Sequence, residues 1–111
     1  MNIIDDIKII ELYFERNEQA IKETDIKYGK FCRNMAYKIL NNHQDSEECV
    51  NTTYLEMWDR IPPTRPAKFK AYISRIVRST SVDRVRHLTA KKRSADMVMA
   101  LDELTDVLPD E

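Results

Sequence analysis

The 111-residue chain is poor in the residues that build tight turns and disulfide frameworks. It has one glycine and four prolines, a scarcity that disfavours β-sandwiches and barrels and favours long helices with short connections. No segment alternates like a strand, and no apolar run reaches membrane-spanning length, so we expect no membrane insertion. Cys32 and Cys49 follow no secretion signal, which predicts buried thiols and a cytoplasmic location. These observations predict an all-α domain, a compact bundle of three to four helices.

Motifs for catalysis and for metal binding are also missing. His43 and His87 lie far apart, and neither has metal-ligand spacing with a cysteine, so we expect no metal site and no cofactor. The sequence contains no glycine-rich phosphate loop and no nucleophile motif. We therefore predict that the chain is not an enzyme, because catalysis would require a composite site that these spacings do not reveal.

The charges are divided into three blocks that the net charge of −1 conceals. Residues 1–63 carry 8 Lys/Arg and 12 Asp/Glu, residues 64–94 carry 10 and 1, and residues 95–111 carry none and 6. The middle block predicts a polyanionic partner. We expect residues 1–94 to form the helical domain and residues 95–111 to form an acidic linker segment, partly ordered or disordered.

Apolar residues at spacings of three and four predict two helices before residue 41. Asn17 is a suitable N-cap for the second, which runs to about Leu40 with Gly29 inside it as a weak point. The expected buried face of the first helix is Ile3, Ile7, Ile10 and Phe14. The expected buried face of the second is Ile21, Tyr28, Cys32, Met35 and Ile39.

A third and a fourth helix flank a proline-rich loop. Asp45 and Glu48 have the spacing of a capping box and predict the start of the third helix, which ends near Arg60 before the prolines of residues 62–66. Its expected buried stripe is Val50, Tyr54, Met57 and Ile61. The fourth helix is predicted from about Ala67 into the low nineties. Its candidate core residues are Phe69, Tyr72, Ile73, Ile76, Thr80 and Val85.

The fourth predicted helix is strongly basic. Its spacing places Arg75, Arg78 and Arg86 on one face, and Asp83 can pair with Arg86 at i,i+3. A merely solvated helix explains only part of this pattern, because one acid cannot balance ten cations. The hydroxyl residues 79–81 argue against a helix that lies on a membrane. Contact with nucleic-acid phosphates is the preferred interpretation, although the long proline-rich loop fits a helix-turn-helix poorly.

Four segments together resemble a known family. They are KYGKFCRNMAYKILNNHQDSEECVNTTYLEMWDRIPP, FKAYISRIVRSTSVDRVR, AKKRS and LDEL. They resemble region two, the sigma2 domain, of bacterial sigma-70 family RNA polymerase sigma factors, most closely the extracytoplasmic-function (ECF) type as found in Firmicutes. Full-length members add a helix-turn-helix domain after a linker. The resemblance therefore implies either a fragment of a longer factor or a stand-alone region two.

The resemblance implies a transcription initiation module that binds core RNA polymerase and recognises and melts the promoter −10 element. It also implies an anti-sigma factor as a further partner. The residues implied to contact a coiled coil of the largest polymerase subunit are Asp45, Glu47, Glu48, Asn51, Leu55 and Trp58. For these, packing in the core and helix capping are the alternatives.

The loop Pro62 to Phe69 is implied to capture a flipped base of the single-stranded non-template strand, and the basic helix to follow the opened DNA. The residues predicted to contact promoter DNA are Arg65, Lys68, Phe69, Tyr72, Arg75, Arg78, Ser79, Arg86, Lys91, Lys92 and Arg93. For the two aromatic residues among them, which could stack on unpaired bases, a place in the core is preferred over stacking.

At four positions the chain departs from the family pattern. Thr52 replaces an acid, Ser79 an asparagine, Ser81 an alanine and Val85 an aromatic residue. Ser79 loses the paired donor and acceptor of an amide, which puts the usual base preference in question. A second hypothesis therefore stays open, a degenerate sigma-like module that binds polymerase or an anti-sigma factor without reading DNA sequence.

Overall fold

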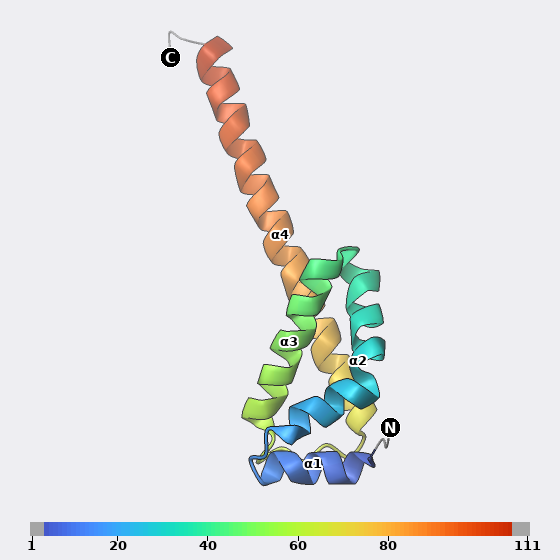
Figure 1. Cartoon of the computed structure of the whole chain (residues 1–111). Helices are drawn as coiled ribbons and strands as arrows, with labels where there is room; N and C mark the ends of the chain where they lie inside the picture. The colour runs from blue at the N-terminus through green and yellow to red at the C-terminus, as the bar shows by residue number, and fades with distance from the viewer. Residues whose placement is uncertain (1–3, 108–111) are drawn as a thin grey trace.

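The computed structural model describes the backbone of residues 4–107 and the side chains of residues 4–93. Its four helices are α1 (Asp6–Phe14), α2 (Gln19–Leu40), α3 (His43–Arg60) and α4 (Phe69–Val107), with no strand among the described residues. Helices α2 and α3 pack against each other and against the first part of α4, while α1 crosses one end of this bundle (Figure 1). The rest of α4 extends away from the bundle (Figure 1). The all-α prediction is confirmed.

Helix α1 packs on a different face from the one predicted. Ile7 is 66% exposed, Phe14 is half-buried, and Ile3 lies outside the described residues. The face is set by Tyr13, which is fully buried and shares a hydrogen bond of 2.8 Å with the hydroxyl of Thr24. The buried residues of α1 are Ile9, Ile10 and Tyr13.

Helix α2 has the predicted limits. The side-chain oxygen of Asn17 accepts a hydrogen bond from the backbone N–H of Gln19 at 2.9 Å, and Asn41 ends the helix in the left-handed conformation at φ 53°. Tyr28 and Cys32 are buried as predicted, whereas Ile21, Met35 and Ile39 are half-buried at the margins of the face. The centre of this face is mostly small, and its buried residues are Ala20, Thr24, Tyr28, Gly29, Cys32 and Ala36.

Helix α3 carries the predicted stripe but begins with a different cap. The side chain of Asn42 accepts a hydrogen bond from the backbone N–H of Asp45 at 2.8 Å, so the predicted capping box starting at Asp45 is wrong. The asparagine lies three residues earlier and already satisfies that N–H, which leaves the Asp45 carboxylate for other contacts. The predicted stripe is confirmed, with Val50, Tyr54, Met57 and Ile61 all buried.

Helix α4 begins at Phe69, close to the predicted start, and continues to Val107, well beyond the low nineties. Residues 69–107 contain neither proline nor glycine, so nothing in the sequence interrupts the helix. Up to Arg93, where the described side chains end, its buried residues are Phe69, Ile73, Ile76, Val77 and Ser81. Tyr72, Thr80 and Val85 are only half-buried. Among the described residues, no helix is both long enough and apolar enough to cross a membrane.

Candidate functional site

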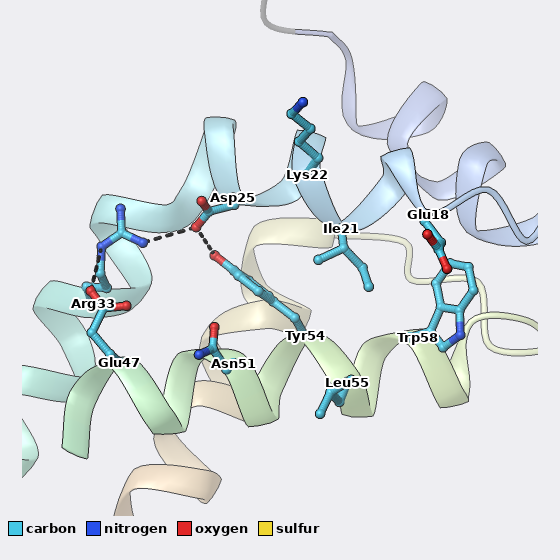
Figure 2. Close-up of a pocket in the computed structure, with 10 residues that line it drawn as sticks. All are labelled: Glu18, Ile21, Lys22, Asp25, Arg33, Glu47, Asn51, Tyr54, Leu55 and Trp58. Carbon is cyan, nitrogen blue, oxygen red and sulfur yellow. Dashed lines mark hydrogen bonds and ion pairs between the residues drawn. The ribbon is translucent and has the colours of Figure 1, made fainter. Parts of the chain in front are cut away.

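A cleft of about 540 Å³ lies between the exposed faces of α2 and α3 (Figure 2). Ile21, Leu55 and Trp58 give one end of the cleft an apolar lining, and Leu55 is 61% exposed (Figure 2). An exposed apolar lining with a charged rim suits the apolar face of a partner helix. The complete lining is Glu18, Ile21, Lys22, Asp25, Arg33, Glu47, Asn51, Tyr54, Leu55 and Trp58.

A hydrogen-bonded network closes the other end of the cleft (Figure 2). The Asp25 carboxylate accepts hydrogen bonds from Arg33 Nη1 at 3.0 Å and from the Tyr54 hydroxyl at 2.8 Å. Arg33 Nε also lies 3.7 Å from Glu47 Oε1. Burial and the bond to Asp25 raise the pKa of Tyr54, so its hydroxyl stays protonated and donates. The network joins α2 to α3 and fixes the charges at this end.

The single glycine of the chain lies under this network. A Cβ on Gly29 would approach Asp25 Oδ1 to 2.5 Å and Arg33 Nη2 to 2.9 Å. The ion pair therefore spans two turns of α2 by passing over a residue without a side chain. Gly29, which looked like a weak point in the helix, makes this arrangement of charges possible.

The six residues predicted to bind polymerase fall on two sides of α3. Glu47, Asn51, Leu55 and Trp58 line the cleft. The other two, Asp45 and Glu48, face α4 instead, where Arg84 Nη2 lies 3.0 Å from the Asp45 carboxylate and 3.2 Å from that of Glu48. The hydrogen bond to Asp45 raises the pKa of Arg84.

Sequence reasoning missed Arg84 because it is one cation among many. The available signal was its helical position, since it lies off the face that Arg75, Arg78 and Arg86 share. Thr52 also lies on the α4 side of α3, in a groove of about 280 Å³ that Arg84 helps to line. Thr52, where the family resemblance implies an acid, therefore lines this groove and not the α2–α3 cleft.

The basic residues of α4 form an exposed surface outside the cleft. Two hollows of about 340 and 450 Å³ share Ala71 and Arg75, and they extend from Pro66 past Tyr72 to Arg78. The Tyr72 hydroxyl is buried without a protein hydrogen-bond partner, and burial raises its pKa. The predicted DNA-binding residues that are exposed are Arg65, Lys68, Arg75, Arg78, Ser79, Arg86, Lys91, Lys92 and Arg93.

Phe69 does not belong to that surface. It is 2% exposed, and its ring packs edge-on against Tyr13 and Tyr28, with centroid separations of 6.4 and 5.9 Å. A base cannot stack on a ring enclosed in this way, so the candidate stacking role is wrong and the preferred place in the core is confirmed. Tyr72 differs, because it is half-buried and lines a hollow.

Two of the three departures in α4 lie away from the basic surface. Ser81 is fully buried and Val85 is half-buried, whereas Ser79 is exposed near the arginines. Asp83 lies 3.9 Å from Arg86, with both side chains more than 70% exposed. This pairing was predicted, and at such exposure it contributes little to stability. Of the three departures, only Ser79 therefore lies on the exposed basic surface.

The described residues contain no group of three or more His, Cys, Asp or Glu side chains that could hold a metal ion. Cys32 and Cys49 are buried free thiols. Burial raises the pKa of Cys32 to about 11, and at neutral pH this disfavours the thiolate that nucleophilic chemistry would need.

The fold and the two surfaces define a class, an all-α module with a partly apolar cleft and a basic helical surface. Residues 26–91, more than half of the chain, match the family described as Sigma-70 region 2. The chain belongs to this family of transcription initiation factors, whose region 2 binds core RNA polymerase and acts in promoter melting, and the family is not a catalytic one. No curated protein and no solved structure shows significant similarity to the chain.

Proposed function

We propose that the chain is an ECF-type region two that binds the coiled coil of the largest polymerase subunit and recognises the −10 element, capturing non-template bases. The observation that carries this proposal is the separation of its two surfaces. An apolar cleft lies between α2 and α3, and the arginines of α4 are exposed elsewhere. A module of this shape can hold a protein and a nucleic acid at the same time.

The cleft supports the polymerase half of the proposal. It offers Leu55 and Trp58 as apolar anchors beside the charged network of Asp25, Arg33 and Glu47. Binding energy in protein interfaces concentrates in a few central residues of this kind, with charges at the rim that select the partner. An anti-sigma factor that blocks polymerase binding would use the same cleft.

The hollows along α4 support the DNA half. Arg75 belongs to both hollows, and Lys68 and Arg78 lie at opposite ends of the pair. Cations at such positions neutralise phosphates along a strand, while the hollow beside Pro66 and Tyr72 offers a recess for an extruded base. In this proposal the module acts in the cytoplasm, and the acidic residues 95–111, of which 95–107 continue α4, form the linker.

The polymerase half is tested with two matched variants. Leu55 and Ile7 are both exposed aliphatic residues, at 61% and 66%, but only Leu55 lines the cleft. We expect Leu55→Asp to weaken binding to the isolated coiled coil by tenfold or more, roughly the loss of one hot-spot contact. Ile7→Asp should leave binding unchanged. Equal affinities of the wild type and Leu55→Asp would contradict the proposal.

The DNA half is tested by binding to single-stranded oligonucleotides with the non-template −10 sequence across a salt series. Each phosphate neutralised contributes a slope of about −0.7 in log affinity against log salt. We expect the slope to equal the sum of several such phosphate contacts. We also expect oligonucleotides with the −10 sequence to bind more tightly than scrambled ones. Affinity that is flat in salt and indifferent to sequence would favour the second hypothesis, a degenerate module without DNA reading, for which the exposed Ser79 is the supporting observation.

A further inference from the structure

Arg16 occupies a backbone position where glycine is usual. It follows α1 with a φ angle of 56°. Its N–H donates to the carbonyl oxygen of Tyr13 at 3.0 Å, and the N–H of Asn17 donates to that of Leu12 at 2.9 Å. These two bonds form a Schellman motif, in which a left-handed residue ends the helix. A residue with a side chain is strained at such an angle, so contacts made by the arginine side chain must offset this strain.

The side chain of Arg16 reaches the end of α3 and holds Trp58 in two ways. Nη1 donates hydrogen bonds to the carbonyl oxygens of Trp58 at 2.8 Å and of Ile61 at 2.7 Å, at the end of the helix where carbonyls lack partners within the helix. The guanidinium carbon also lies 3.8 Å from the centroid of the Trp58 ring, as a cation–π contact. The ring of Tyr13 approaches the same indole, with a centroid separation of 6.2 Å. Both the backbone and the ring of Trp58 are therefore held from the side of α1.

Trp58 is the only tryptophan of the chain and lines the apolar end of the cleft. An aromatic anchor binds most tightly when its orientation is fixed before the partner arrives, because less side-chain freedom is then lost on binding. Helix α1 and Arg16 lie outside the residues that match the family, 26–91. The contacts that hold Trp58 in the cleft thus come from a segment that the family match does not include.

We propose that Arg16 is a positioning residue that holds the Trp58 indole in the orientation in which the cleft receives its partner helix. This inference rests on the proposed function, because the partner is taken to be the coiled coil of polymerase. Arg16 acts through Trp58, so removing the arginine should matter only while the indole is present. That dependence separates positioning from a direct contact between Arg16 and the partner.

The test measures binding of a labelled peptide of the polymerase coiled coil to Arg16→Met, Trp58→Ala and the double variant. We expect Arg16→Met to weaken binding by about two- to fivefold, the range that corresponds to one exposed cation–π contact. The double variant should bind no more weakly than Trp58→Ala alone. Lys70→Met is the matched control, since Lys70 Nζ lies 4.8 Å from the ring centroid of Phe31, away from the cleft lining. It should bind like the wild type.

The fluorescence of Trp58 gives a second readout that needs no partner. In free Arg16→Met we expect lower emission anisotropy and stronger quenching by acrylamide than in the wild type, because the indole has lost the cation that covers it. Arg16→Gly should behave in the same way. Glycine suits the positive φ, so this variant keeps the end of α1 intact and excludes misfolding as the cause.

Unchanged quenching in both variants, or binding losses that add in the double variant, would overturn the proposal. Failure of the wild type itself to bind the peptide would refute the proposed function instead. That outcome is distinguishable, because the fluorescence of the Arg16 variants would still differ from that of the wild type.

Discussion

Ser81 should destabilise the fold, and replacing it with alanine should therefore stabilise the protein. The residue is 0% exposed, so water does not reach its hydroxyl, and the hydroxyl has no hydrogen-bond partner in the protein. A buried hydroxyl without a partner costs about 1–3 kcal/mol, and alanine is a better helix former than serine by a few tenths. Allowing for the small void left by the oxygen, we expect Ser81→Ala to raise the free energy of unfolding by about 1 kcal/mol.

Ser46 provides the matched control for this prediction. It is also a buried helical serine, 3% exposed, but its hydroxyl donates to the carbonyl oxygen of Asn42 at 2.6 Å. Ser46→Ala removes a satisfied hydroxyl, so it should lower the free energy of unfolding by about 0.5–1 kcal/mol. The two substitutions are chemically identical and both lie in helices, so their difference isolates the missing hydrogen bond.

Urea unfolding followed by circular dichroism and by the emission of Trp58 gives both free energies. For a domain of this size, 1 kcal/mol corresponds to a shift in Tm of roughly 4–8 °C, so a thermal scan resolves the change. The reasoning would be refuted if Ser81→Ala lost as much stability as Ser46→Ala. That result would mean that the nearby Cys49 thiol, although a weak hydrogen-bond partner, satisfies the Ser81 hydroxyl. Burial raises the pKa of Cys49, and the nearby Ser81 hydroxyl lowers it by a smaller amount.

Three further predictions concern charge and pH. Arg84→Met should lower Tm because it leaves two carboxylates on α3 without their partner, whereas Arg86→Met, which removes an exposed pair at 3.9 Å, should leave Tm unchanged. Arg75→Met should reduce the salt slope of oligonucleotide binding by about 0.7, with little change in sequence preference, if its contact is to one phosphate. Burial raises the pKa of Cys32 from 9.0 to about 11 and that of Tyr13 from 10.0 to about 12. Because the unfolded chain loses these protons first, the stability that these two groups contribute should be constant below about pH 9. The free energy of unfolding should then fall as the pH rises from about 9 to about 12, which denaturant titrations at each pH would measure. Constant stability across that range would contradict the burial of both groups.

The sequence was most informative where a helix has one apolar face and polar residues elsewhere. The stripe of α3 and the limits of α2 were predicted correctly, because a regular period of apolar residues leaves little choice of face. The face of α1 was wrong because Ile7 and Ile9 compete on a short helix, and the decision rests on Tyr13, whose partner Thr24 lies on another helix. The spacing of apolar residues along one helix cannot reveal a hydrogen bond to another helix.

The candidate site was predicted less completely than the fold. Four of the six residues assigned to polymerase binding line one cleft, but Asp45 and Glu48 face Arg84. The sequence shows that both residues are acidic. It does not show which way their side chains face, because this depends on how α4 packs against α3. Arg16 gave no signal, since its role follows from a left-handed backbone and from carbonyl groups that the fold brings within reach.

The position of Gly29 has a consequence for how this protein could be made more robust. Replacing a glycine within a helix by alanine ordinarily stabilises a protein by up to about 1 kcal/mol, which makes the only glycine of the chain an obvious engineering target. Here the added methyl group would meet the tips of Asp25 and Arg33, which can rotate aside without moving the backbone. The helix would gain stability, and Tyr54 would lose the ordered carboxylate that it contacts. Gly29→Ala would thus stiffen α2 while disordering the charged network at one end of the cleft.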